Sequence, residues 1–206
     1  MIKFSKNVIL TPGAGYHPDP AAPLCDGDDI SWMLRARVGD AQGQSSACTL
    51  FGLANWVQIM GGPVVPDALI IAAWERARMR YYGNTDGGLT VPQAWHSAVL
   101  EGWLESRQTA ECVRDMTSFG TAPLLGCYEI TDGWYYPNEA GCIRHTDTQV
   151  VGYHLVVIIE AGRVADAAPI IWIQNSWSLK WGYKGCGQLT AEYHRRHCKE
   201  LWKINP

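Results

Sequence analysis

The stretch from Gln42 to Trp56 constrains the fold more than any other part of the chain. A polar loop that ends at Cys48 leads directly into apolar residues at helical spacing. These positions are Leu50, Leu53, Ala54, Val57 and Met60, and they are followed by Gly61-Gly62-Pro63. The pattern predicts a core helix that begins at Cys48 and stops at the glycines.

Cys48 is placed at the start of a helix, where a thiol can be reactive. The unpaired N–H groups and the positive dipole at a helix N-terminus favour a thiolate. Gln42, six residues earlier, can fold back and offer a side-chain N–H to an oxyanion beside the sulfur. The alternative is a buried structural cysteine that starts a core helix, since buried thiols are common.

Composition narrows the function classes. The 206 residues carry a net charge of -3, which argues against a nucleic-acid partner. The seven cysteines are odd in number and include no C-x-x-C pair, which favours a reducing compartment over a disulfide framework. No apolar run approaches the roughly 20 residues of a membrane span. We therefore expect a cytoplasmic protein that is not associated with a membrane and that uses no cofactor.

The N-terminal half is predicted to be helical. Residues 1–29 are rich in proline and glycine and predict an irregular arm. Residues 68–81 have one apolar face, with Asp67 as N-cap and with solvated arginines at 76, 78 and 80. Thr90 and Gln93 form a predicted capping box for a helix over residues 91–101. We expect a helical lobe over about residues 42–110.

The C-terminal half is predicted to form strands. Apolar runs predict strands at residues 123–130, 154–159, 170–174 and 182–189. His154 would begin the second of these strands, and Asn175 would follow the third. The fold class is therefore α+β, with a β lobe over about residues 120–206 and one domain over residues 30–206. Neighbouring antiparallel strands would bring His154 and Asn175 together, although a histidine at such a position, taken by itself, is more often a hydrogen-bonded core residue.

Four motifs resemble the papain-like cysteine peptidases, in the family's order and over roughly residues 30–190. Gln42-Gly43 and Cys48 resemble the glutamine and the nucleophilic cysteine, and Asp86-Gly87-Gly88 resembles the substrate-binding Asn-Gly-Gly. His154 and the apolar residues after it resemble the catalytic histidine and its strand. Residues 175–185, Asn-Ser-Trp-Ser-Leu-Lys-Trp-Gly-Tyr-Lys-Gly, resemble the family's Asn-Ser-Trp-Gly-x-x-Trp-Gly-x-x-Gly.

The resemblance implies a two-lobed fold with the active site in the cleft between a helical lobe and an antiparallel β lobe. It implies that Cys48 is the nucleophile, His154 its imidazolium partner and Asn175 the orienting amide. Gln42 and the backbone N–H of Cys48 would form the oxyanion hole. The remaining expected substrate-site residues are Gly87, Gly88, Leu89, Trp177, Ser46 and Tyr153.

Departures from the family pattern matter as well. Ser45 and Thr85 stand where secreted members pair two cysteines, which agrees with a reducing cytosol. Ser46 replaces a pocket-lining glycine, and Thr49 replaces the usual tryptophan after the nucleophile. The arm at residues 1–29 lacks the helical pattern of the usual pro-domain.

Three functions are compatible with these residues. The first is a cysteine peptidase acting on a peptide or protein substrate. The second is an amidase or acyl transferase that uses the same site on a non-protein amide, and the third is a peptide-binding pseudo-enzyme. A metal site at His194, His197 and Cys198 is disfavoured against an exposed polar helix, because no second ligand pair has zinc spacing.

Overall fold

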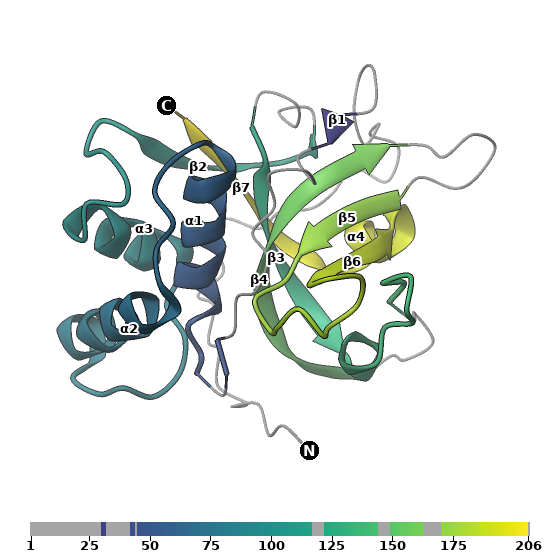
Figure 1. The fold of residues 1–206 in the computed structure, drawn as a ribbon, viewed down its shortest axis with the longest axis horizontal. Helices are drawn as coiled ribbons and strands as arrows, with labels where there is room; N and C mark the ends of the chain where they lie inside the picture. The colour runs from purple at the N-terminus through teal and green to yellow at the C-terminus, as the bar shows by residue number, and fades with distance from the viewer. Residues whose placement is uncertain are drawn as a thin grey trace.

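The computed structural model describes residues 30–31, 42–43, 45–116, 122–143, 149–162 and 170–205. The arm expected at residues 1–29, Cys25 and His145 lie outside these ranges. Three helices lie on one side of the molecule and an antiparallel sheet lies on the other (Figure 1). The α+β class and the division into a helical and a β part are as predicted.

The three helices of the N-terminal half begin and end close to the predicted positions. Helix α1 spans Cys48–Ile59, α2 spans Asp67–Tyr82 and α3 spans Val91–Leu100. Gly83 ends α2 in the left-handed conformation, with φ of 68°, which glycine adopts without strain. The capping box at Thr90 and Gln93 is present. Asp67 lies in the first turn of α2, whose N-cap is Pro66 instead.

The sheet has the strand order β2-β7-β3-β4-β5-β6, and β1 pairs with β4. The bounds are β1 Ile30–Ser31, β2 Thr109–Val113, β3 Leu124–Thr131, β4 Val150–Gly162, β5 Ile170–Gln174, β6 Cys186–Thr190 and β7 Cys198–Asn205. The 3-10 helix η3 (Asp132–Tyr135) follows β3, and helix α4 (Ala191–His197) precedes β7. All of these strand pairings are antiparallel.

The structure differs from the expectations at one strand start, at two strands that were not predicted and at the last helix. His154 lies inside β4 and not at its start, because the pairing with β3 continues as far as Thr131 and Val150. Strands β2 and β7 were not predicted. Strand β2 brings residues 109–113 into the sheet, although residues 109 and 110 belong to the range expected for the helical lobe. Helix α4 exists, but it is only partly exposed because Tyr193 and His194 are buried.

The central strands separate two hydrophobic cores. Side chains of β3 and β4 alternate in direction, so Leu125 and Leu155 pack against the helices, whereas Leu124 and Val156 face the second core with Trp134. Gly52 allows α1 to approach β4 closely, since a Cβ there would lie 2.3 Å from Leu155 Cδ2. The N-terminus of α1 is therefore held against the middle of the sheet.

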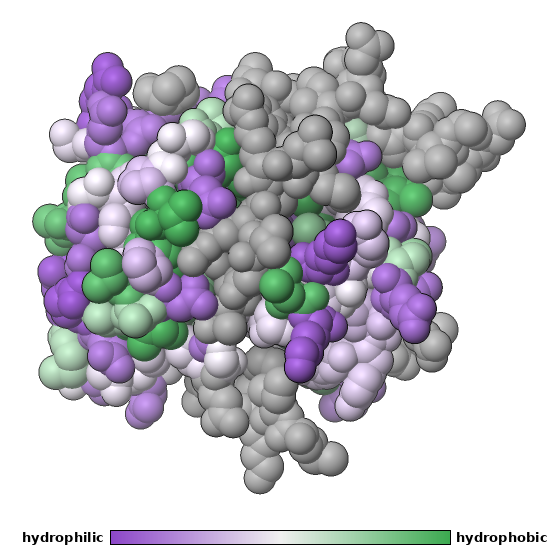
Figure 2. All heavy atoms as spheres, viewed as in Figure 1, coloured by the Kyte–Doolittle hydropathy of each residue, from purple (hydrophilic) through white to green (hydrophobic). Residues whose placement is uncertain are grey.

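The coloured part of the face in Figure 2 carries hydrophobic side chains scattered among hydrophilic ones over the helical side. Exposed hydrophobic residues of this lobe include Val64, Leu69, Met79 and Leu100. Within the described ranges, no helix is both long and apolar enough to cross a bilayer.

Candidate active site

The thiol of Cys48 lies at the N-terminus of α1, against the sheet. Ala47 is the N-cap and offers no side-chain hydrogen bond, so the first N–H groups of α1 have no capping acceptor. The backbone amides of Leu155, Thr49 and Cys48 itself all act to lower the pKa of the thiol. The sulfur is therefore near the residue that directly follows His154, and donors surround it.

The imidazole of His154 is fixed by Asn175 in one tautomer. His154 Nε2 and Asn175 Oδ1 are 2.7 Å apart, and both residues are buried. The backbone N–H of Ser176 also donates to Asn175 Oδ1, at 2.7 Å, so that atom must be the amide oxygen. His154 Nε2 must then carry the hydrogen, which leaves Nδ1 of a neutral ring as the proton acceptor.

Burial controls the charge of both groups. It raises the pKa of Cys48, and the surrounding backbone amides compensate only in part. It lowers the pKa of His154 to about 4, although the hydrogen bond with Asn175 acts in the opposite direction. The thiolate expected from the helix N-terminus is therefore opposed by desolvation. With each group considered alone, the protein at neutral pH holds an uncharged Cys48 thiol and an uncharged His154 imidazole.

The Gln42 side chain is held from both ends. Ser176 Oγ donates to Gln42 Oε1 at 2.5 Å, and Gln42 Nε2 donates to the carbonyl of Ser45 at 2.9 Å. The backbone N–H of Gln42 also donates to the carbonyl of Ser176 at 2.8 Å. A primary amide has two N–H donors, so one remains after the bond to Ser45. That donor is pre-oriented by contacts to both halves of the molecule.

Aromatic rings enclose His154 on the sheet side. The Trp177 ring lies 4.9 Å from the imidazole, centroid to centroid, and the Tyr135 ring stacks on Trp177 at 5.5 Å. Trp134 meets His154 edge-on at 6.2 Å and accepts, through its carbonyl, a hydrogen bond of 2.6 Å from Trp181 Nε1. This cover excludes water from the His154–Asn175 bond and strengthens it.

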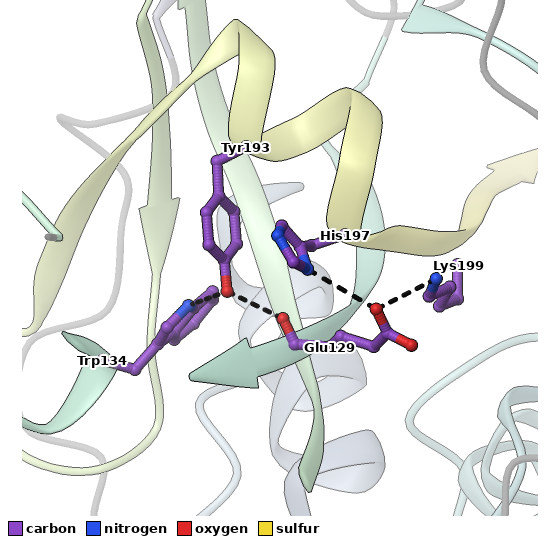
Figure 3. A network of polar contacts seen from close by, with 5 residues as sticks. All are labelled: Glu129, Trp134, Tyr193, His197 and Lys199. Carbon is purple, nitrogen blue, oxygen red and sulfur yellow. Dashed lines mark hydrogen bonds and ion pairs between the residues drawn. The ribbon is translucent and has the colours of Figure 1, made fainter. Parts of the chain in front are cut away.

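Behind this cover, a polar network ties Trp134 to α4 (Figure 3). Trp134 Nε1 donates to Tyr193 Oη at 2.8 Å, and Tyr193 donates to the backbone carbonyl of Glu129 at 2.9 Å. The Glu129 carboxylate lies 3.0 Å from Lys199 Nζ and 3.5 Å from His197 Nδ1. His197 thus has a carboxylate partner, and His194 lies 2.7 Å from the Tyr128 hydroxyl. No cluster of potential metal ligands is found in the described ranges.

The expected substrate-site residues fall in different environments. Gly87 and Gly88 are half-buried in the segment between α2 and α3, and Trp177 is half-buried over His154. Tyr153 precedes His154 on β4, and Ser46 precedes α1; both are half-buried. The Leu89 side chain is 1 % exposed and packs in the core between the helices and the sheet.

Sequence reasoning assigned no role to three residues that shape the site. Ser176 was quoted within a motif, but its bond to Gln42 depends on the fold. Trp134 belongs to none of the expected strands or motifs, and it lies in η3. Arg78 was expected to be solvated and is buried. A signal for Arg78 was available, because it stands one helical turn after Trp74, a residue of the apolar face.

Comparisons with known proteins identify the fold. Neither family models nor curated protein sequences match the chain. Among solved structures, the proform of the ragweed pollen cysteine protease Amb a 11 is 14% identical, with a TM-score of 0.66 over 94% of this chain and 73% of that one. Digestive procathepsin L 3 of Tenebrio molitor is 14% identical, with a TM-score of 0.68 over 98% of this chain and 76% of that one. Xylellain, a cysteine protease from Xylella fastidiosa, is 16% identical, with a TM-score of 0.68 over 98% of this chain and 94% of that one. The chain has the two-lobed fold of these enzymes.

Proposed function

We propose that this chain, which has the papain-like cysteine protease fold, is a cysteine peptidase that hydrolyses peptide bonds through Cys48, His154 and Asn175. The observation that carries the proposal is the buried bond between His154 Nε2 and Asn175 Oδ1. It leaves Nδ1 as the proton acceptor, and the thiol that would supply the proton lies at an uncapped helix N-terminus. Nucleophile, base and orienting group are thus supplied by three separate elements.

In the first half of the reaction, His154 Nδ1 takes the proton of Cys48 and leaves a thiolate. The imidazolium and the thiolate would stabilise each other, which offsets the burial that disfavours each charge alone. The thiolate then attacks the substrate carbonyl. The carbonyl oxygen becomes an oxyanion that receives hydrogen bonds from the Cys48 backbone N–H and from the remaining N–H of Gln42 Nε2. The carbon–nitrogen bond then breaks, and His154 returns its proton to the leaving amine.

In the second half, water attacks the thioester. His154 Nδ1 takes a proton from the water, and the same two donors stabilise the second oxyanion. The carbon–sulfur bond breaks, Cys48 recovers its proton from His154, and the carboxylic acid product leaves. Trp177 and Trp134 would hold the imidazole in one orientation throughout both halves.

Labelling and turnover together test this proposal. A peptidyl vinyl sulfone should add once to the protein, and peptide mapping should locate the adduct on Cys48. Turnover of a fluorogenic peptidyl amide library should be lost in Cys48→Ala by roughly three orders of magnitude or more, as for loss of a catalytic nucleophile. Cys127→Ala is the matched control, since Cys127 is also a buried thiol but lies within β3.

The alternatives give different results in the same experiment. Labelling at Cys48 with turnover of non-peptide amides or esters alone would identify an amidase or an acyl transferase. Peptide binding without labelling or turnover would identify a pseudo-enzyme. Labelling at a cysteine other than Cys48 would refute the nucleophile assignment.

A further inference from the structure

Trp134 forms one wall of the space around the His154 imidazole, and it is held at both ends. Its side chain is fully buried, and its ring meets the imidazole at 84°, with 6.2 Å between the centroids. Its carbonyl accepts a hydrogen bond from Trp181 Nε1, and its own Nε1 donates to Tyr193 Oη at 2.8 Å (Figure 3). Within the described ranges, this indole N–H donates to no other acceptor. Because a buried donor without an acceptor is costly, the position of the ring depends on the Tyr193 hydroxyl.

The Tyr193 side chain is placed by both α4 and β3. Its backbone N–H donates to Oγ1 of Thr190, the N-cap of α4, and its ring stacks on the His197 ring at 4.3 Å between centroids. Its hydroxyl donates to the carbonyl of Glu129 at 2.9 Å. Glu129 directly follows the last residue of β3 that pairs with β7. A carbonyl can only accept and an indole N–H can only donate, so the hydroxyl gives its hydrogen to β3 and offers a lone pair to Trp134.

The register of the sheet puts this attachment close to the imidazole. Glu129 directly follows Tyr128, and Tyr128 is the cross-strand partner of His154 on β4. Paired residues of an antiparallel sheet share a face, and Trp134 contacts both, with 5.9 Å between its ring and that of Tyr128. The bond from Tyr193 to Glu129 therefore fixes the indole relative to the same pair of strands that carries the imidazole.

We propose that Tyr193 is a positioning residue of the peptidase, whose hydroxyl fixes the Trp134 ring against His154 and so holds the imidazole in the orientation in which Nδ1 accepts a proton. Tyr193 lies on α4, outside all four motifs of the sequence. Loss of the hydroxyl leaves the indole N–H without an acceptor, and a ring that turns toward another acceptor no longer confines the imidazole. This lowers kcat and leaves substrate binding unchanged. The inference rests on the proposed function, since it concerns the base of that reaction.

Kinetics of Tyr193→Phe, which keeps the ring and removes only the hydroxyl, test the proposal first. We expect kcat for a tripeptidyl fluorogenic amide to fall roughly three- to tenfold, with KM within about twofold of the parent value. Lys199→Met is the matched control from the same network, because it breaks the ion pair with the Glu129 carboxylate and leaves the hydroxyl in place. Tyr82→Phe removes a hydroxyl hydrogen bond of similar length from the exposed side of α2. Both controls should keep the parent kcat and KM.

A double-mutant cycle shows whether the hydroxyl acts through Trp134. Trp134→Phe removes the N–H that needs an acceptor, so adding Tyr193→Phe in this background should change kcat by less than about twofold. The same fall in both backgrounds would show that the hydroxyl acts through the Glu129 carbonyl and β3, and it would overturn the inference.

Exchange of the imidazole hydrogen supplies a readout that needs no catalysis. In a Cys48→Ala protein, the hydrogen on His154 Nε2 should exchange slowly with solvent, because it is buried and bonded to Asn175. Adding Tyr193→Phe should make this exchange roughly tenfold faster, while the backbone amides of β3 and β4 keep their protection. Loss of protection at those amides as well would show a general structural role, and unchanged imidazole exchange would show that the hydroxyl does not position the ring.

The remaining outcomes separate this inference from the proposed function. An unchanged kcat in folded Tyr193→Phe, or a higher KM at constant kcat, would overturn the positioning role. If the parent protein turns over no peptide, the peptidase proposal fails, and exchange of the His154 hydrogen then tests the inference by itself. If Tyr193→Phe does not fold, Trp134→Phe removes the donor of the same hydrogen bond. Its imidazole hydrogen should also exchange faster, and slow exchange there would overturn the inference.

Discussion

His154 and the Gly87–Gly88 segment are held in place by opposite means. His154 is 4% exposed, is enclosed by the rings of Trp177 and Trp134, and has one buried hydrogen bond to Asn175. The glycine segment is half-exposed and is held by polar side chains that reach its carbonyls from α2.

The difference fits the role that we propose for each region. The proposed proton acceptor, His154, has to keep one orientation and one tautomer, and dense packing in a dry environment provides both. A segment that is proposed to bind the substrate backbone has to leave backbone groups open to a ligand, so side chains can support it only from the α2 side. We therefore expect changes near His154 to act on kcat and changes under the glycine segment to act on KM.

After loss of the nucleophile itself, the largest effect is expected at Gln42, which joins the loop before α1 to Ser176 of the β part. Gln42→Ala removes the oriented N–H donor but leaves the bonds of Ser45 and Ser176 to the Gln42 backbone. We expect kcat and kcat/KM to fall together by about 10²–10³, the usual cost of one lost oxyanion donor. Steady-state kinetics on the tripeptidyl amide measures this.

Ser176→Ala is the companion variant for Gln42. It removes only the bond that holds Gln42 Oε1, so it should give a smaller loss of kcat in the same direction. Equal kcat for Gln42→Ala and the parent protein would show that the side chain only connects the loop to the β part.

The second effect concerns Asn175. It tests whether changes in the packed region, defined as His154, Asn175 and the rings around them, alter kcat without altering peptide binding. Asn175→Ala removes the acceptor that selects the His154 tautomer, and it should reduce kcat by roughly one to two orders of magnitude. Asn175 follows β5 and fills no strand position, so the fold should be retained. Tripeptide binding to a Cys48→Ala, Asn175→Ala double variant should match that of Cys48→Ala.

A pseudo-enzyme would behave differently, with any effect of Asn175→Ala confined to binding or stability. A folded variant with full activity would falsify the role of Asn175. A parallel loss of peptide affinity would break the contrast between the two regions.

Much of this site could be predicted from local sequence. The start of α1 at Cys48 and the capping box of α3 depend on residues within one helical turn, and the structure has both. The proximity of His154 and Asn175 followed from two adjacent apolar runs, and β4 and β5 do pair. Local patterns therefore sufficed where neighbours in space are also neighbours in sequence.

The remaining features depend on contacts that are distant in sequence. Strand β2 pairs with β7, about ninety residues away, and its mixed exposure gives no clear alternation. Arg78 is a charged residue whose burial becomes favourable only because a loop returns its carbonyls to α2. The burial of Cys48 has a similar origin, since the sheet that packs on α1 desolvates the thiol and raises its pKa.

The smallest expected effect is a loss of stability in acid that is confined to the packed region. Burial lowers the pKa of His154 to about 4, and burial followed by the charge of Arg195 lowers the pKa of His194 to about 4. An unfolded histidine titrates near 6.5, so between pH 6.5 and 4 the unfolded chain binds protons that the folded chain does not. Stability should therefore decrease as pH falls through this window, by on the order of 1 kcal/mol for each buried histidine. Urea midpoints at pH 7 and pH 5 measure the global effect. His194→Gln should make that dependence less steep, whereas His96→Gln, a change at an exposed histidine, should not.

Hydrogen exchange corrected for intrinsic rates should show lower protection at pH 5 for the amides of β4 and unchanged protection for residues 84–90. Equal loss of protection in both segments would mean that the two regions open as one cooperative unit, and the contrast between them would then hold for catalysis but not for stability.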